Sequence, residues 1–140
     1  MARVDRISPR EKQPEYYADV PLNMERNLVT GQLGRLTNDD AIKQSMVTLA
    51  LTSPKERFYQ PWIGCRIQES LFGLVDDPTV IDDIRKSLQA CYDTNEPRVN
   101  IENVTISEDI DRNGYNVSVT FSSINIQQIE TVDIFVSRVR

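Results

Sequence analysis

The hydrophobic pattern of this 140-residue chain changes its period at one proline, Pro97. Upstream of it, apolar residues recur at the three- and four-residue spacing of a helix face; downstream they alternate, as in a strand with one buried side. Pro97 lacks a backbone donor and disfavours the α region for Glu96, so a helix should end before this point. The sequence therefore predicts a compact α+β domain, with helices packed on a mostly antiparallel sheet that ends in a hairpin and a terminal strand.

Two charged residues flank this corner, Glu96 before the proline and Arg98 after it. Opposite charges on a rigid kink can form a fixed ion pair within the chain, or they can be displayed to a partner. The sequence alone leaves both interpretations open.

Two helices are expected, over about 39–51 and 78–93. The first has a Thr37 cap followed by acidic residues, and the second has Pro78 at its first helical position after the acidic pair Asp76-Asp77. Their apolar stripes are Ile42, Met46, Leu49 and Ala50 in the first helix, and Ile81, Ile84, Leu88 and Cys91 in the second.

The segment between these helices is predicted to be a structured loop over 51–65, followed by a short helical turn. Its two prolines break regular structure, and Gly64 should permit a close turn. Phe58, Tyr59 and Trp62 offer much apolar area, so we expect them to pack against the loop itself. In the turn that follows, Ile67, Leu71 and Phe72 should face inward.

After the corner, alternation predicts strands over about 99–108, 115–122 and 131–138. The parity of the apolar residues shifts near Glu102-Asn103, which predicts a β-bulge. Asn113-Gly114 is typical of a hairpin turn in which both residues have positive φ.

The N-terminal residues 1–21 are predicted to be an arm, and residues 22–140 the folded domain. Prolines punctuate the arm, and in its first twelve residues four basic side chains stand against two acidic ones, so it is either a frayed terminus or a tether that orders against a more acidic neighbour. Tyr16 and Tyr17 are the candidate anchors. Residues 22–36 should form a short strand or an irregular extended segment.

Composition excludes several functions. The net charge of −5 lacks the basic footprint of a nucleic-acid binder, and no stretch is apolar and long enough to span a membrane. The chain has no histidine, so Cys65 and Cys91 cannot build an ordinary zinc site; they are expected to be buried free thiols rather than a disulfide. No metal and no cofactor are predicted.

Catalysis is not predicted either. A pair of carboxylates could in principle hydrolyse a glycosidic bond, but helix caps and first helical turns explain most of the acidic residues. The candidates are Glu56, Glu69, Asp76, Asp77, Asp82, Asp83 and Glu96. No catalytic residue is assigned.

The terminal strand is the second candidate for a binding site. A last strand is often a sheet edge, and an edge with unpaired backbone groups can accept a partner strand by β-augmentation. The alternative is a central or protected strand.

Five short motifs follow one another along the chain: Ala41–Ser45, Leu49–Arg57, Pro61–Cys65, Leu71-Phe72 and Glu96–Val99. Their order resembles the small baseplate wedge proteins of contractile-tailed phages, a family sometimes labelled lysozyme-like, with relatives in type VI secretion baseplates. The resemblance covers about 37–136, and its most specific element is Glu96-Pro97-Arg98. Where the family usually has Gly before Glu-Arg in the upstream loop, this chain has Lys55.

This resemblance implies a structural subunit that docks on the inner baseplate and templates the first sheath ring by strand augmentation. It implies contacts with other wedge proteins through Glu96, Pro97 and Arg98, to which we add Glu56 and Arg57 of the loop, and with the tail sheath protein. The augmenting strand would comprise Thr131, Val132, Asp133, Ile134, Phe135 and Val136. The resemblance further implies several copies in a six-fold assembly, located in the virion tail baseplate and assembled in the bacterial cytoplasm.

Two other functions stay open on the sequence. The family label allows a peptidoglycan hydrolase that acts during tail penetration, and the edge strand alone would also suit a free-standing cytosolic adaptor. Neither function has a motif of its own in this chain.

Overall fold

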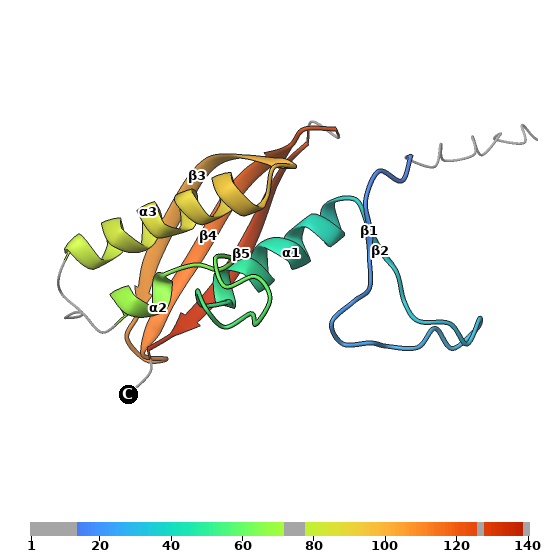
Figure 1. The fold of residues 1–140 in the computed structure, drawn as a ribbon, viewed down its shortest axis with the longest axis horizontal. Helices are drawn as coiled ribbons and strands as arrows, with labels where there is room; N and C mark the ends of the chain where they lie inside the picture. Colours follow the sequence, from blue (N-terminus) through green and yellow to red (C-terminus); the bar gives the residue numbers. More distant parts are fainter. Residues whose placement is uncertain (1–13, 72–77, 126–127, 139–140) are drawn as a thin grey trace, which may run out of the picture.

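The computed structural model describes residues 14–71, 78–125 and 128–138, and these fold as the α+β domain that the sequence predicts (Figure 1). Its elements are β1 (Ala18–Asp19), β2 (Leu36–Thr37), α1 (Asp39–Leu51), α2 (Ile67–Ser70), α3 (Pro78–Asn95), β3 (Val99–Asp109), β4 (Gly114–Ser123) and β5 (Ile129–Ser137).

The main sheet is an antiparallel meander in the order β3-β4-β5. The predicted bulge is confirmed, since the β3–β4 register shifts between Ile101 and Asn103. The turn between these strands corrects one expectation: Asn113 has a φ of 50°, but Gly114 already belongs to β4 and has no positive φ. Gly114 is needed for space, because a Cβ there would lie 2.5 Å from the Val136 carbonyl oxygen on β5.

Helices α1 and α3 cover one face of this sheet (Figure 1). The alternating residues of β4 and β5 that point toward the helices are buried. The other face carries serine, threonine and asparagine on β4, and a mixed set that includes Ile129, Asp133 and Phe135 on β5. The Tyr92 hydroxyl on α3 donates to the Met46 carbonyl of α1 at 3.1 Å, which joins the two helices inside the core. The largest fully buried side chains are Tyr92, Tyr115, Phe121, Ile42, Met46, Ile67, Ile84 and Leu88.

The start of α1 differs from the prediction. Thr37 ends β2, and Asn38 occupies the cap position without capping the helix through its side chain. That side chain instead accepts hydrogen bonds from the backbone N–H groups of Tyr16 and Tyr17 and donates to the Pro14 carbonyl. Threonine and asparagine both suit a helix cap, so sequence preference alone does not place the start of α1; the contacts of Asn38 with the N-terminal segment do. The acidic cap proposed for α3 lies outside the described residues.

The loop after α1 is ordered by backbone hydrogen bonds, but its aromatic side chains are not buried. Phe58, Tyr59 and Trp62 are 96%, 92% and 71% exposed, so the prediction that they pack within the loop is wrong. The loop closes instead through Lys55 N–H to the Pro61 carbonyl and Cys65 N–H to the Thr52 carbonyl, both at 2.8 Å.

Gly64 permits that closure, as predicted. Its φ is 142°, and a Cβ would lie within 2.8 Å of backbone atoms of Thr52, Ser53 and Pro54. After the loop, Ile67 and Leu71 are buried as expected, whereas Phe72 lies outside the described residues. Cys65 and Cys91 are free and buried, as predicted; a hydrogen bond with Cys91 and burial both raise the pKa of the Cys65 thiol.

The N-terminal segment folds back onto the domain. β1 pairs antiparallel with β2, and between them the chain makes an excursion that projects away from the sheet (Figure 1). Among the described residues, no helix has the length and hydrophobicity needed to cross a membrane.

Candidate partner-binding cleft

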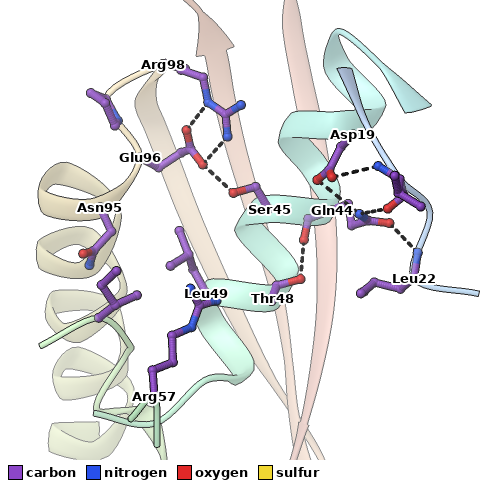
Figure 2. A pocket seen from close by; sticks show the side chains of 13 residues that line it. Asp19, Leu22, Gln44, Ser45, Thr48, Leu49, Arg57, Asn95, Glu96 and Arg98 are labelled. Atoms are coloured by element: carbon purple, nitrogen blue, oxygen red, sulfur yellow. Dashed lines mark hydrogen bonds and ion pairs between the residues drawn. The ribbon is translucent and has the colours of Figure 1, made fainter. Parts of the chain in front are cut away.

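An open cleft of about 530 Å³ lies between the N-terminal segment, α1, the loop after α1 and the α3–β3 corner (Figure 2). Its lining residues are Asp19, Val20, Leu22, Gln44, Ser45, Thr48, Leu49, Arg57, Ile63, Asn95, Glu96, Pro97 and Arg98. Four of the five residues predicted to bind a partner therefore line one site. Glu56 is absent from the lining.

The corner itself is held by three side chains, Ser45, Glu96 and Arg98, which we call the corner brace (Figure 2). Arg98 forms a two-pronged ion pair with the Glu96 carboxylate, with Nη2 at 2.7 Å from Oε2. Ser45 Oγ donates to the same oxygen at 2.6 Å. Of the two interpretations left open by the sequence, the fixed ion pair is the one observed.

Burial and pairing act in opposite directions on the Glu96 carboxyl, which is only 3% exposed. Burial acts to raise its pKa, but the hydrogen bonds from Arg98 and Ser45 and the Arg98 charge outweigh burial, so the pKa lies below its ordinary value. The Arg98 pKa is raised, chiefly by its hydrogen bond to Glu96. Glu96 is thus an ionised, internally satisfied group, while the adjacent Pro97 is exposed.

The N-terminal segment joins the corner through Tyr17. The Arg98 guanidinium carbon lies 5.2 Å from the centre of the Tyr17 ring, a cation–π contact, and Asn125 Nδ2 donates to the Tyr17 hydroxyl. Tyr17 also packs against the core, whereas Tyr16 is 53% exposed. The described part of the arm is therefore anchored on its own domain by Tyr17 and Asn38.

One side chain of α1 fixes the opposite wall of the cleft. Gln44 accepts from the Leu22 N–H at 3.0 Å, and its Nε2 donates to the Val20 carbonyl at 2.9 Å and to an Asp19 carboxylate oxygen at 3.3 Å (Figure 2). Gln44 and its neighbour Ser45 thus position the two walls. Sequence reasoning missed both, although their polar character off the apolar stripe of α1 was the available signal.

The loop residues of the predicted site have separate roles. The Glu56 carboxylate accepts from the Ser53 N–H at 2.9 Å and so shapes the loop. Arg57 is exposed, lines the cleft and forms no ion pair among the described residues. Lys55 has a φ of 73°, a left-handed conformation that favours glycine and so agrees with the expectation of glycine at this position.

The predicted augmenting residues lie in the middle of β5. Val132, Ile134 and Val136 are buried under the helices, whereas Thr131 and Asp133 are exposed on the opposite face, with Phe135 partly so. In the described part of the sheet, β5 pairs with β4 alone. β5 is therefore an edge strand.

Among the described residues, no group of three or more histidine, cysteine, aspartate or glutamate side chains is arranged to hold a metal ion. The cleft offers a mixed polar and apolar surface, and hydrogen bonds between α1, the N-terminal segment and the corner hold its walls in place.

The fold and this site define a small α+β domain whose described sheet ends in the edge strand β5 and whose helices flank an open, largely polar cleft. The model of the family described as baseplate wedge protein gp25 matches residues 37–126, and the chain belongs to this family. It is thus a structural component of a phage-tail-type baseplate.

Two solved structures have the same fold. One is a cryo-EM structure of the six-fold symmetrised baseplate of the anti-feeding prophage, with a TM-score of 0.67 and 20% identity over 80% of this chain and 89% of that one. The other is a crystal structure of a candidate tail lysozyme from Geobacter sulfurreducens, with a TM-score of 0.66 and 18% identity over 71% of this chain and 89% of that one. No curated protein matches the sequence significantly.

Proposed function

We propose that this wedge protein docks on the inner baseplate through the cleft and templates the first sheath ring by offering β5 for β-strand augmentation. Its partners would be other wedge proteins and the tail sheath protein, with several copies in a six-fold baseplate of a virion tail that is assembled in the bacterial cytoplasm. The observation that carries this proposal is that the outer edge of β5 pairs with no other strand among the described residues.

The edge of β5 is long and regular. It pairs with β4 over nine consecutive residues without a register shift. The Arg138 N–H donates to the Asn113 carbonyl, and the Val136 oxygen points at Gly114, so even-numbered residues of β5 bond to β4. Because antiparallel pairing alternates, the backbone groups of Thr131, Asp133 and Phe135 should point outward, where a partner strand could pair with them.

The other edge of the sheet is less suited to augmentation. β3 carries the bulge after Ile101, and Arg85 of α3 reaches over to the Val104 carbonyl at 3.4 Å. Bulges and covering side chains are common means of blocking unwanted strand pairing. The two edges of the described sheet therefore differ, and β5 is the one that offers a regular, uncovered strand.

Nothing in the cleft favours a hydrolase. The general acid of a glycosidase needs a raised pKa, whereas the Glu96 pKa is lowered and its carboxylate is engaged by Arg98 and Ser45. The lysozyme name belongs to the Geobacter protein. No observation favours a free-standing adaptor over a baseplate subunit either.

A proline at position 131 tests the proposal. Thr131→Pro removes an outward-facing N–H and should leave the ladder to β4 intact, since edge strands tolerate proline there. We expect baseplates that contain the variant but carry no extended sheath, while Thr131→Ala, which keeps the N–H, assembles normally. Full-length sheaths on Thr131→Pro baseplates would contradict templating by β5.

A further inference from the structure

The excursion between β1 and β2 is a preformed hairpin, residues 20–34, which we call the prong. Its two sides are joined by the Arg26–Leu33 bridge and by the Gly34 N–H, which donates to the Glu25 carbonyl at 3.0 Å. The prong projects from the domain in the direction away from the sheet (Figure 1). It also precedes residue 37, where the family match begins. The prong is therefore an addition to the matched part of the domain.

The tip of the prong is fixed by its own hydrogen bonds. Asn27 Oδ1 accepts from the N–H groups of Val29 and Thr30, at 2.9 and 3.3 Å. The Gly31 carbonyl accepts from Arg26 Nε at 2.9 Å, and Gly31 adopts a φ of 69°. A tip held in this way can bind without paying the ordering entropy of a flexible loop.

This ordered tip exposes aliphatic side chains that lie outside the hydrophobic core. Leu28 and Val29 are adjacent at the end of the prong, and their side chains are 99% and 94% exposed. Leu22, Met24 and Leu33 along its sides are also more than half exposed. Single exposed apolar residues are common, but a cluster on a preformed protrusion is typical of a protein contact.

The charges near the tip indicate the kind of partner. Arg26 is exposed and forms no ion pair among the described residues, so its terminal nitrogens are available. One arginine beside an apolar tip lacks the cluster of basic residues that binding to an anionic membrane requires. It matches a protein pocket with an apolar floor and a carboxylate on its rim.

We propose that the prong inserts Leu28 and Val29 into an apolar pocket of a neighbouring baseplate subunit, and that Arg26 pairs with a carboxylate at the rim of that pocket. The partner is a different protein rather than a second copy, because the cleft described above is lined largely by polar residues and so lacks the apolar floor that Leu28 and Val29 require. This inference rests on the place of the chain in a baseplate, but not on the augmentation of β5.

The test uses the full chain in cells that express the rest of the gene cluster. Leu28→Ser/Val29→Ser is compared with Ile110→Ser, which alters an 81%-exposed aliphatic residue in the β3–β4 turn. Both proteins should melt like wild type, because the altered residues are exposed. We expect the prong variant to be recovered in sedimented baseplates at one tenth of the wild-type amount or less, since losing a hot-spot contact costs about tenfold or more in affinity. Recovery equal to that of Ile110→Ser would overturn the proposal.

A photo-crosslinking residue at position 28 identifies what the tip contacts. A crosslink to another baseplate protein, weakened in an Arg26→Glu background, supports the proposal. A crosslink to lipid or to a second copy of this chain would overturn it. Failure here differs from failure of β5 templating, because Thr131→Pro should leave both the recovery in baseplates and this crosslink unchanged.

Discussion

Ser45 and Glu96 are joined by a 2.6 Å hydrogen bond although they are 51 residues apart. Ser45 lies on α1 and Glu96 follows α3, so this contact and the Arg98 ion pair bring helix, corner and sheet together. The charged residues of the Glu-Pro-Arg motif therefore hold the corner between α3 and β3 in place within the chain itself. Its charged groups shape a site, and the proline that they flank is the exposed part.

Arg98→Ala should destabilise the domain by about 2–4 kcal/mol, because it leaves a buried carboxylate without its cation. Urea unfolding at neutral pH measures this loss. The matched control is Arg35→Ala, which removes an exposed ion pair with Glu15 and should change stability by less than about 1 kcal/mol. Equal stability of both variants would show that the corner brace is not structural.

The brace also predicts a pH dependence. The folded Glu96 pKa lies below its ordinary value of 4.5, so the carboxylate contributes stability above about that pH. This contribution is lost as pH falls through the lower folded pKa. The stability difference between wild type and Glu96→Gln should therefore be largest near neutral pH and shrink below about pH 4.5. A difference that grows on acidification would contradict the lowered pKa.

Two loop positions should respond in opposite directions. Gly64→Ala should lower the free energy of unfolding by at least about 2 kcal/mol. The new Cβ would clash with backbone atoms of residues 52–54, which cannot move aside without shifting the loop. Lys55→Gly should raise the free energy of unfolding by about 0.5–1 kcal/mol. The glycine relieves the strain of a left-handed backbone, and this gain exceeds the extra backbone entropy that glycine loses on folding. Thermal unfolding of the two single variants measures both. A stabilising Gly64→Ala would show that the loop closes differently.

Gln44→Ala should loosen the wall of the cleft without unfolding the core. It removes three hydrogen bonds to residues 19–22, so residues 18–34 should exchange amide hydrogens faster, while α3 and β4 are unchanged. The control is Gln89→Ala, at an exposed position of α3. Hydrogen exchange followed by mass spectrometry compares the two, and identical protection of residues 18–34 would contradict the anchoring role of Gln44.

Local signals were sufficient for most of the fold. The helical spacing before Pro97 and the alternation after it predicted α1, α3 and the three long strands, and the parity shift located the bulge at Ile101–Asn103. These predictions succeeded because the apolar residues that repeat in sequence are the ones that pack together.

The failures have distinct physical causes. The hydrogen bonds of Asn38 and the roles of Gln44 and Ser45 depend on contacts between segments that are distant in the sequence, which local patterns do not contain. The prediction for Phe58, Tyr59 and Trp62 assumes that apolar groups are buried within their own chain, and this assumption fails for these three side chains.

Hydrogen exchange over β5 tests strand augmentation most directly. In the isolated protein the outward amides of Thr131, Asp133 and Phe135 should exchange rapidly, while those that bond to β4 are protected. In baseplates that carry sheath, we expect the outward amides to become protected too, and in baseplates without sheath to stay exposed. An unchanged exchange pattern over 129–137 in sheathed baseplates would contradict the proposal that β5 receives a strand of the sheath.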